Sequence, residues 1–293
     1  MNVLILRMHE HKRGIVAGRS ECPKCHHTLS SKDLIPLLSF LLLRGKCRYC
    51  RTKISWQYVG MELVTGFLWF TITYALLPFY SLELLPAYFF FLFFANLLLV
   101  IAIYDIRYLE IPNKLTFPFM LVLIICSFLN FTPTLLNGLY GALSVFGFFY
   151  LQILIPYFLY SLRKKKWELF KSVLLLPFWF LMQIISPHKW FCREDDDDES
   201  PSDLVEWIGF GDLRIAVMMG FILGLKFSIL ALFISYFIGA IIGVFVILKE
   251  RKRRKMIPFG PFLVLGTFIT LFYGQIILNA YLKFGEVLRS VIL

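Results

Sequence analysis

The stretch "LPAYFFFLFFANLLLVIAIYDIRYLEIPN", from Leu85 to Asn113, decides the class of fold. Its first part, Leu85 to Tyr104, contains no charged residue, and about 20 apolar residues in a helix are enough to cross the hydrocarbon core of a bilayer. Asp105 stands where this apolar run ends. The stretch therefore predicts a transmembrane helix with a carboxylate at its edge. An ionised carboxylate in that position is costly, which suggests that it has a function.

The composition of the whole chain is typical of a membrane protein. Of the 293 residues, 59% are hydrophobic, whereas soluble domains contain roughly 45–50% apolar residues. Further apolar runs extend over about Val59 to Leu77, Leu115 to Phe131, Leu136 to Tyr160, Trp207 to Leu225, Phe227 to Leu248 and Ile257 to Leu282. We therefore expect an all-α polytopic membrane protein with about seven transmembrane helices.

The basic residues fall on alternate connections between these runs. Lys and Arg are concentrated before the first run and after the second, fourth and sixth, whereas the other connections contain only Lys226. By the positive-inside rule the basic connections are cytoplasmic, which also places Asp105 and Asp212 at the cytoplasmic edge. The formal charge of +11 is then a matter of topology, and no nucleic-acid partner is expected. The apolar stretch after Met1 is too short for a cleavable signal peptide, so the N-terminus is expected to be cytosolic.

One apolar run, Leu169 to Pro187, does not fit this alternation. Counting it as a span would place Asp212 on the outer side. We therefore expect an interfacial or re-entrant helix on the cytoplasmic side, with a kink at Pro177. The acidic run Glu194 to Glu199 follows it and is expected to be a solvated loop.

Two CxxC pairs precede the first span, in the segments "ECPKCHHTL" and "GKCRYCRTKIS". Two such pairs can surround a tetrahedral metal ion, and four sulfur ligands leave no position open for water. The pattern therefore predicts a structural zinc site whose ligands are Cys22, Cys25, Cys47 and Cys50.

Other arrangements of these cysteines stay open. His26 or His27 could replace one of the four sulfur ligands. Two disulfides are a further alternative, which the reducing environment of the cytoplasmic side disfavours. Cys126 and Cys192 stand alone in the sequence and are expected to be inert apolar fillers.

A second aspartate, Asp212, begins an apolar run in "WIGFGDLRIAVMMGF", as Asp105 ends another. Two carboxylates within a few Å share a proton, so the ionised one can deprotonate a water while the protonated one donates to the carbonyl under attack. Gly209 and Gly211 let the backbone before Asp212 bend and let another segment approach closely. After Asp105 a proline ends the helix, and Asn113 can cap the next helix. Either aspartate alone could be a helix-end carboxylate that reaches water, but the two contexts together favour catalysis.

These segments resemble the two catalytic motifs of type IV prepilin peptidases, which are aspartic proteases of the GxGD type. The residues that carry the resemblance are Asp105, Ile111-Pro112-Asn113, Leu115-Thr116 and Gly209-x-Gly211-Asp212. The cysteine segment, which ends near Glu62, is similar to the cytoplasmic zinc-binding region of the bifunctional members of that family. The segment "IPFGPFL", from Ile257 to Leu263, is similar to a late motif of the family.

The resemblance implies an integral-membrane aspartic endopeptidase of the cytoplasmic (inner) membrane. Such an enzyme cleaves the basic leader of prepilins and pseudopilins after a glycine, on the cytoplasmic side, with Asp105 and Asp212 as the catalytic pair. Bifunctional members also methylate the new N-terminal residue with S-adenosylmethionine, although this sequence contains no glycine-rich loop of the Rossmann type. The expected partners are prepilin-like substrates and the lipid bilayer.

The resemblance also divides the chain. Residues 1–57 are expected to form a cytoplasmic zinc-binding region, and residues 58–293 a transmembrane aspartic peptidase domain with a cytoplasmic insertion at about 162–206. Arg214 stands where the family commonly has lysine. This keeps the positive charge but replaces the compact ammonium group of lysine with the planar guanidinium of arginine. The membrane helix that usually precedes the cysteine region is represented here only by "MNVLILRM".

Two other classes of protein stay in view. A carrier or channel that uses intramembrane carboxylates would spread them over several depths along a path, whereas the two aspartates here are expected at one depth. A membrane scaffold with a zinc ribbon and no activity would tolerate the loss of either aspartate.

Overall fold

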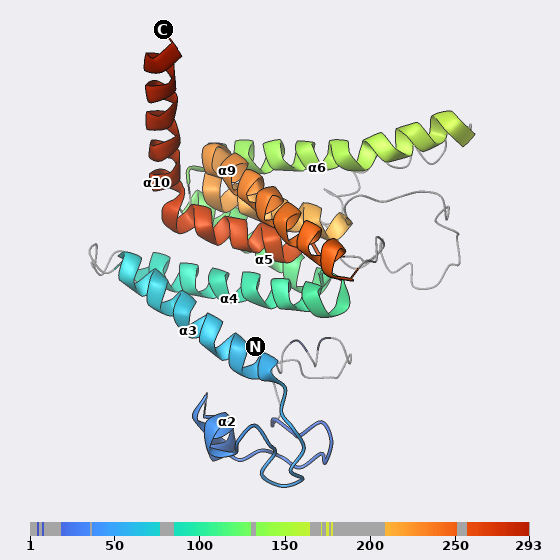
Figure 1. Cartoon of the computed structure of the whole chain (residues 1–293), viewed down its shortest axis with the longest axis vertical. Coiled ribbons are helices and arrows are strands. Elements are labelled where there is room, and N and C mark those ends of the chain that lie inside the picture. The colour runs from blue at the N-terminus through green and yellow to red at the C-terminus, as the bar shows by residue number, and fades with distance from the viewer. Residues whose placement is uncertain are drawn as a thin grey trace. The chain divides into compact units, whose positions relative to one another are not determined.

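The computed structural model describes Ile5, Met8, and residues 19–35, 37–76, 85–129, 133–164, 171, 174, 175, 177, 209–250 and 257–292. These residues form helices and two isolated β-bridges, and they include no strand. The prediction of an all-α fold is therefore confirmed for this part of the chain. In chain order (Figure 1) the elements are η1 (Ser31–Leu34), α2 (Leu38–Leu42), α3 (Trp56–Leu76), α4 (Leu85–Tyr108), α5 (Asn113–Phe128), α6 (Leu135–Lys164), α9 (Phe210–Glu250) and α10 (Gly260–Ile292).

Several of these helices are suited to a membrane. By length and composition, four helical segments of the described residues could cross a bilayer: Leu85–Tyr108, Leu135–Leu162, Gly211–Lys249 and Gly260–Lys283. Leu115–Phe128 is a shorter apolar helix, and α3, with 21 residues, is not among the four. The protein is thus a multi-pass membrane protein, as its composition predicts.

The 41-residue element α9 consists of two helices that meet at Gly224. Gly224 has φ 70° and ψ 178°, a backbone conformation that essentially only glycine adopts. A Cβ at this position would lie 2.6 Å from Nδ2 of Asn137 in α6. Asn137 Oδ1 in turn accepts a hydrogen bond from the N–H of Leu225 at 3.0 Å. The two apolar runs predicted on either side of this point are therefore separate helices.

Helix α6 lies along both halves of α9. Its residue Asn137 is at the break, and Gly141 faces the backbone of Gly220 before the break. After the break, the Tyr236 hydroxyl donates a hydrogen bond to Gln152 Oε1 at 2.7 Å. Helix α6 therefore runs antiparallel to the first half of α9 and parallel to its second half. This is the arrangement of a helical hairpin, and Figure 1 shows the two halves of α9 side by side.

The first half of α9 is the central helix of this part of the fold. Every residue from Asp212 to Gly224 is buried, and helices α5, α6 and α10 all contact α9. The second half instead exposes large apolar side chains such as Phe233, Phe237 and Phe245. Lipid can cover these side chains, whereas the first half is enclosed by protein.

The chain divides into two compact units, Met1–Val100 and Ile101–Leu293. In the first unit, α3 runs antiparallel to the beginning of α4. Trp69 Nε1 donates a hydrogen bond to Asn96 Oδ1 at 3.3 Å, and the hydroxyls of Thr73 and Tyr88 lie 2.9 Å apart. These polar contacts between apolar helices fix how α3 lies against α4.

The close backbone contact between α6 and α9 predicts that a larger residue at Gly220 lowers the stability of the protein. A Cβ at Gly220 would lie 2.3 Å from the backbone nitrogen of Ala142, whereas a Cβ at Gly243 in the other half of α9 would meet nothing within 4 Å. We expect Gly220→Ala to destabilise the protein by about 1–3 kcal/mol, because overpacking forces the helices apart. Gly243→Ala, the matched control, should leave stability unchanged or raise it slightly. Thermal unfolding of the two variants in detergent measures the difference, and equal midpoints would contradict the packing described here.

Candidate functional site

The two aspartates selected from the sequence lie in one part of the fold. Asp105 is near the end of α4, and Asp212 is in the first turn of α9. Their exposed fractions are 5% and 8%, so both are buried. Both belong to the second compact unit, and their carboxylates are close enough to interact electrostatically. The structure therefore brings together two carboxylates that are 107 positions apart by their residue numbers.

A third segment reaches Asp105. The backbone N–H of Gly260, the first residue of α10, donates a hydrogen bond to Asp105 Oδ2 at 3.1 Å. A Cβ on Gly260 would lie 2.5 Å from this oxygen and 3.0 Å from Ile215 Cδ1. Glycine is therefore needed for the N-terminus of α10 to approach the carboxylate. A backbone N–H and a helix N-terminus both stabilise negative charge on Asp105.

The sequence predictions include "IPFGPFL" as a motif but not the contact of Gly260 with Asp105. A signal was present, because Gly260 and Pro261 start a helix that follows a basic connection. The segment before it is held by aromatic rings. Phe259 packs against Tyr236, with ring centroids 4.8 Å apart, and against Phe149 at 6.3 Å.

The loop after Asp105 packs against the glycine motif before Asp212. A Cβ on Gly211 would lie 2.7 Å from Cδ1 and 2.9 Å from Cβ of Ile111. Gly211 thus provides the close approach that the sequence predicted, and Ile111 is the residue that approaches. The amide N–H of Asp212 donates to the carbonyl of Gly209 at 3.1 Å. The two motifs therefore form one packed unit around the aspartates.

A buried arginine links the same two motifs. Arg214 is 6% exposed, and its Nη1 donates a hydrogen bond to Asn113 Oδ1. Its Cζ also lies 4.8 Å from the centroid of the Phe117 ring, a cation–π geometry. The helix α5 begins at Asn113, with Pro112 as its N-cap and no side-chain capping bond. The expectation that Asn113 caps this helix is therefore wrong, because its side chain binds Arg214 instead.

The four cysteines of the two CxxC pairs converge in the first unit. The sulfur atoms of Cys22, Cys25, Cys47 and Cys50 all lie within 4.8 Å of one another, an arrangement that could hold a metal ion. The four are free thiols, and no histidine belongs to the group within the described residues. His27 instead packs its ring against Tyr49, at 3.7 Å between centroids.

The two cysteine pairs have the same backbone geometry. In the first, the N–H of His26 donates to Cys22 O at 2.9 Å, and in the second, the N–H of Arg51 donates to Cys47 O at 3.0 Å. His26 and Arg51 both have a positive φ, 55° and 59°. Each pair thus closes a tight turn that directs its two sulfurs to the same side. This repeated turn explains why the spacing alone identified the cluster.

The electrostatics of the cluster suit a cation. The Thr52 hydroxyl, 3.3 Å from Cys50 Sγ, lowers the pKa of the Cys50 thiol to about 6. Backbone hydrogen bonds from Cys25 and Lys24 lower the pKa of Cys22. The backbone N–H of His27 acts to lower the pKa of Cys25, but desolvation and the neighbouring Cys22 and Cys50 sulfurs raise it to about 11. This mutual repulsion of thiolates is what a bound cation would remove.

The remaining predictions fall on other parts of the chain. Cys126 is a buried free thiol, as expected of an apolar filler. Cys192, the acidic run Glu194 to Glu199 and most of the segment Leu169 to Pro187 lie outside the described residues. The interfacial helix and the acidic loop therefore stay predictions.

Comparison with known proteins covers almost the whole chain. Residues 1–76 match the family model described as "Bacterial Peptidase A24 N-terminal domain", and residues 92–244 match the model of the type IV leader peptidase family. No solved structure matches the chain.

Curated relatives carry the name prepilin leader peptidase/N-methyltransferase. The protein of that name from Bacillus subtilis is 30% identical over 272 residues, which cover 92% of this chain and 87% of the relative. Those from Aeromonas salmonicida and Pseudomonas aeruginosa are each 26% identical, over 94% and 92% of this chain and 78% and 77% of their own lengths. With both halves of the chain matched in this way, the protein belongs to the type IV leader peptidase family.

Proposed function

We propose that this protein is an integral-membrane aspartic endopeptidase that removes the basic leader of prepilins or pseudopilins by cleavage after a glycine. The observation that carries the proposal is the buried pair Asp105 and Asp212, which three helix ends bring together in a member of a peptidase family. The names of the relatives support prepilin-like proteins as the substrates.

In this mechanism the two aspartates share one proton. The ionised carboxylate accepts a proton from a water molecule, whose oxygen attacks the scissile carbonyl, and the protonated carboxylate donates to the carbonyl oxygen. When the gem-diol intermediate collapses, the carbon–nitrogen bond breaks, the leaving amine takes a proton from one carboxyl group, and a hydroxyl of the intermediate returns its proton to the other carboxylate, which restores the pair. The hydrogen bond from Gly260 fixes Oδ2 of Asp105 during these steps.

Arg214 acts on the geometry of this pair. Its bond to Asn113 ties the start of α9 to the start of α5, so it sets how the segment that carries Asp212 lies against the loop that follows Asp105. Among the described residues Arg214 forms no salt bridge. The partners of its guanidinium are therefore the Asn113 side-chain carbonyl and the Phe117 ring.

A second activity of the same protein is N-methylation of the residue that cleavage exposes. The names of the relatives and the match of residues 1–76 to the bacterial N-terminal domain of the family support it. S-adenosylmethionine would supply the methyl group. Among the described residues, none is assigned to hold this cofactor.

We assign zinc with a structural role to the four-cysteine cluster. Cys22 Sγ and Cys50 Sγ lie 3.8 Å apart, and a tetrahedral site with zinc–sulfur bonds of about 2.3 Å has sulfurs about 3.8 Å apart. Four thiolates fill the coordination of zinc, so the metal would hold the two turns together without binding a substrate.

The topology of the protein is also part of the proposal. The alternation of Lys and Arg along the sequence supports a cytoplasmic (inner) membrane location, with Asp105 and Asp212 facing the cytoplasm. We divide the chain into a zinc-binding region, residues 1–57, and a peptidase domain, residues 58–293. Within the insertion at about 162–206, the acidic run would attract a basic leader by charge. A carrier or channel is not favoured, because the comparisons point to a peptidase.

The catalytic pair makes the first prediction. Asp105→Asn and Asp212→Asn should each lower the rate of prepilin leader cleavage by at least about 100-fold, because each removes an acid–base group. Glu110→Gln, which changes an exposed carboxylate in the loop after α4, should cleave like the wild type. The measurement is leader removal by purified protein in detergent, and a variant of either aspartate that kept full activity would refute the assignment.

Gly260 makes the second prediction. Because a Cβ there would meet Asp105 Oδ2 at 2.5 Å, Gly260→Ala should lower kcat for cleavage by about 10-fold to 100-fold with little change in KM. Gly147→Ala in α6, where a Cβ meets nothing within 4 Å, is the control. Unchanged kcat in a folded Gly260→Ala variant would show that Gly260 does not position Asp105.

The metal site makes the third prediction. Protein purified without chelators should contain about one zinc per chain, and Cys22→Ser with Cys47→Ser should abolish it, whereas Cys126→Ser should not. Because protons compete with the metal for the thiolates, zinc should be held at neutral pH and released as the solution is acidified. Elemental analysis measures the metal. Wild-type protein that holds no zinc at neutral pH would overturn the assignment.

A further inference from the structure

An exposed apolar surface surrounds the short helix α2. Leu38, Leu41 and Leu42 occupy one face of α2 by their spacing, and they are 51%, 68% and 74% exposed. The neighbouring side chains Leu34, Ile35 and Trp56 are also exposed, at 48%, 45% and 74%. We call these six residues the α2 patch. Several large apolar side chains gathered in this way mark a surface that is covered in the working protein.

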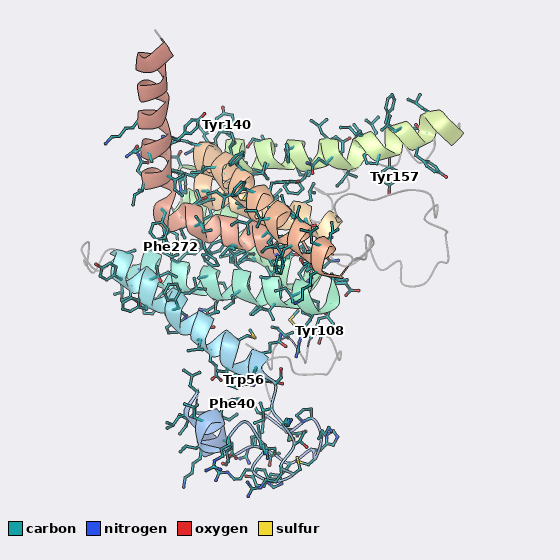
Figure 2. All side chains as sticks on the ribbon, viewed as in Figure 1. Phe40, Trp56, Tyr108, Tyr140, Tyr157 and Phe272 are labelled. Carbon is teal, nitrogen blue, oxygen red and sulfur yellow. The ribbon has the colours of Figure 1, made fainter. Side chains whose placement is uncertain are left out.

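The α2 patch is fixed against the start of α3. The rings of Phe40 and Trp56 lie 5.0 Å apart between centroids, and Figure 2 shows these two labelled side chains close together. The backbone N–H of Leu37 donates a hydrogen bond to Glu62 Oε2 at 2.7 Å. Leu37 has φ 56°, so this bond holds a backbone conformation that is unfavourable for leucine. The position of α2 is therefore set by the first two turns of α3.

Helix α3 exposes large apolar side chains that lipid can cover. Leu63, Phe67 and Phe70 on its surface are 55%, 68% and 67% exposed, and α3 is bonded along α4, which contains a candidate membrane span. A helix that lies along a span shares its bilayer. Trp56 begins α3, and tryptophan is enriched at the boundary between lipid and water. If α3 shares the bilayer of α4, the α2 patch lies at the level where α3 enters it.

The exposed charges beside the α2 patch are basic, whereas the Glu62 carboxylate is half-buried and bonded to the Leu37 N–H. Lys32 precedes it, and Arg44 and Lys46 follow α2 directly, all with exposed side chains. The one acidic residue of η1, Asp33, is bonded to Arg48, with 2.6 Å between Oδ1 and Nε. Apolar side chains flanked by Lys and Arg are the composition of segments that lie in the headgroup region of an anionic bilayer. A basic peptide would be repelled from the same place.

We propose that the α2 patch inserts into the headgroup region of an anionic lipid bilayer on the side where α3 begins. The apolar side chains enter the boundary between lipid and water, and Arg44 and Lys46 bind lipid phosphates. Helix α2 lies between the two cysteine pairs in the chain, with Cys25 before it and Cys47 after it, so this contact holds the cluster against the membrane surface. This inference rests on the membrane helices and not on the proposed peptidase activity.

The test uses the full chain reconstituted into vesicles. A photoreactive benzoylphenylalanine replaces Leu41 in one protein and Lys24, an exposed residue of the first cysteine turn, in the control. After illumination, mass spectrometry detects lipid attached to the protein. We expect a yield at least about fivefold higher at position 41 than at position 24, and a severalfold higher yield at position 41 in vesicles with phosphatidylglycerol than in pure phosphatidylcholine.

Further variants separate the outcomes. Arg44→Gln with Lys46→Gln should abolish the dependence on phosphatidylglycerol and leave the metal content of the cysteine cluster unchanged, which shows that the region is folded. Placing the photoreactive group at Leu42 instead of Leu41 should give the same lipid adduct. Equal lipid yields at positions 41 and 24, or attachment to a second protein chain or an added apolar peptide in place of lipid, would overturn the proposal. None of these results depends on prepilin cleavage.

Discussion

The burial of the first half of α9 among other helices is the constraint on which the rest of the second compact unit depends. From Asp212 to Gly224 every residue is buried, so this helix contacts protein instead of lipid on all sides. A carboxylate and a guanidinium could not be placed in its first turn otherwise, because isolated charges in hydrocarbon are costly. The surrounding helices supply polar partners there and apolar packing further along.

Glycine makes this enclosure possible at several levels. Gly220 lets α6 approach to backbone contact, and Gly224 lets the chain turn back so that the second half of α9 can face outward. At the site, Gly211 lets Ile111 approach the backbone closely, and Gly260 does so for Asp105. Close backbone approach thus both packs the membrane helices and brings a backbone N–H to the Asp105 carboxylate, and small residues commonly allow such approach between transmembrane helices.

Sequence and structure agree where the physical signal is local. Apolar runs of sufficient length predict helices, and the repeated CxxC turn predicts the convergence of four sulfurs. Gly260 and Pro261 mark the start of a helix in the sequence, but the contact of Gly260 with Asp105 joins residues far apart in the chain, so no local pattern shows which side chain this helix start reaches. Asn113 shows a second limit of prediction from sequence. An asparagine can either cap a helix or accept a hydrogen bond from an arginine such as Arg214, and the sequence does not show which of the two it does. Phe149 and Phe259 show a third, since in a chain with 32 phenylalanines nothing distinguishes the few that support a site.

The central claim is that Asp105 and Asp212 work as one unit, and a double-mutant cycle tests it most directly. Single-turnover cleavage of a prepilin is measured for the wild type, Asp105→Asn, Asp212→Asn and the double variant. If the carboxylates share one proton and one reaction, the double variant should lose no more activity than the worse of the two single variants. Losses that multiply in the double variant would show that the two residues act independently and would contradict the account.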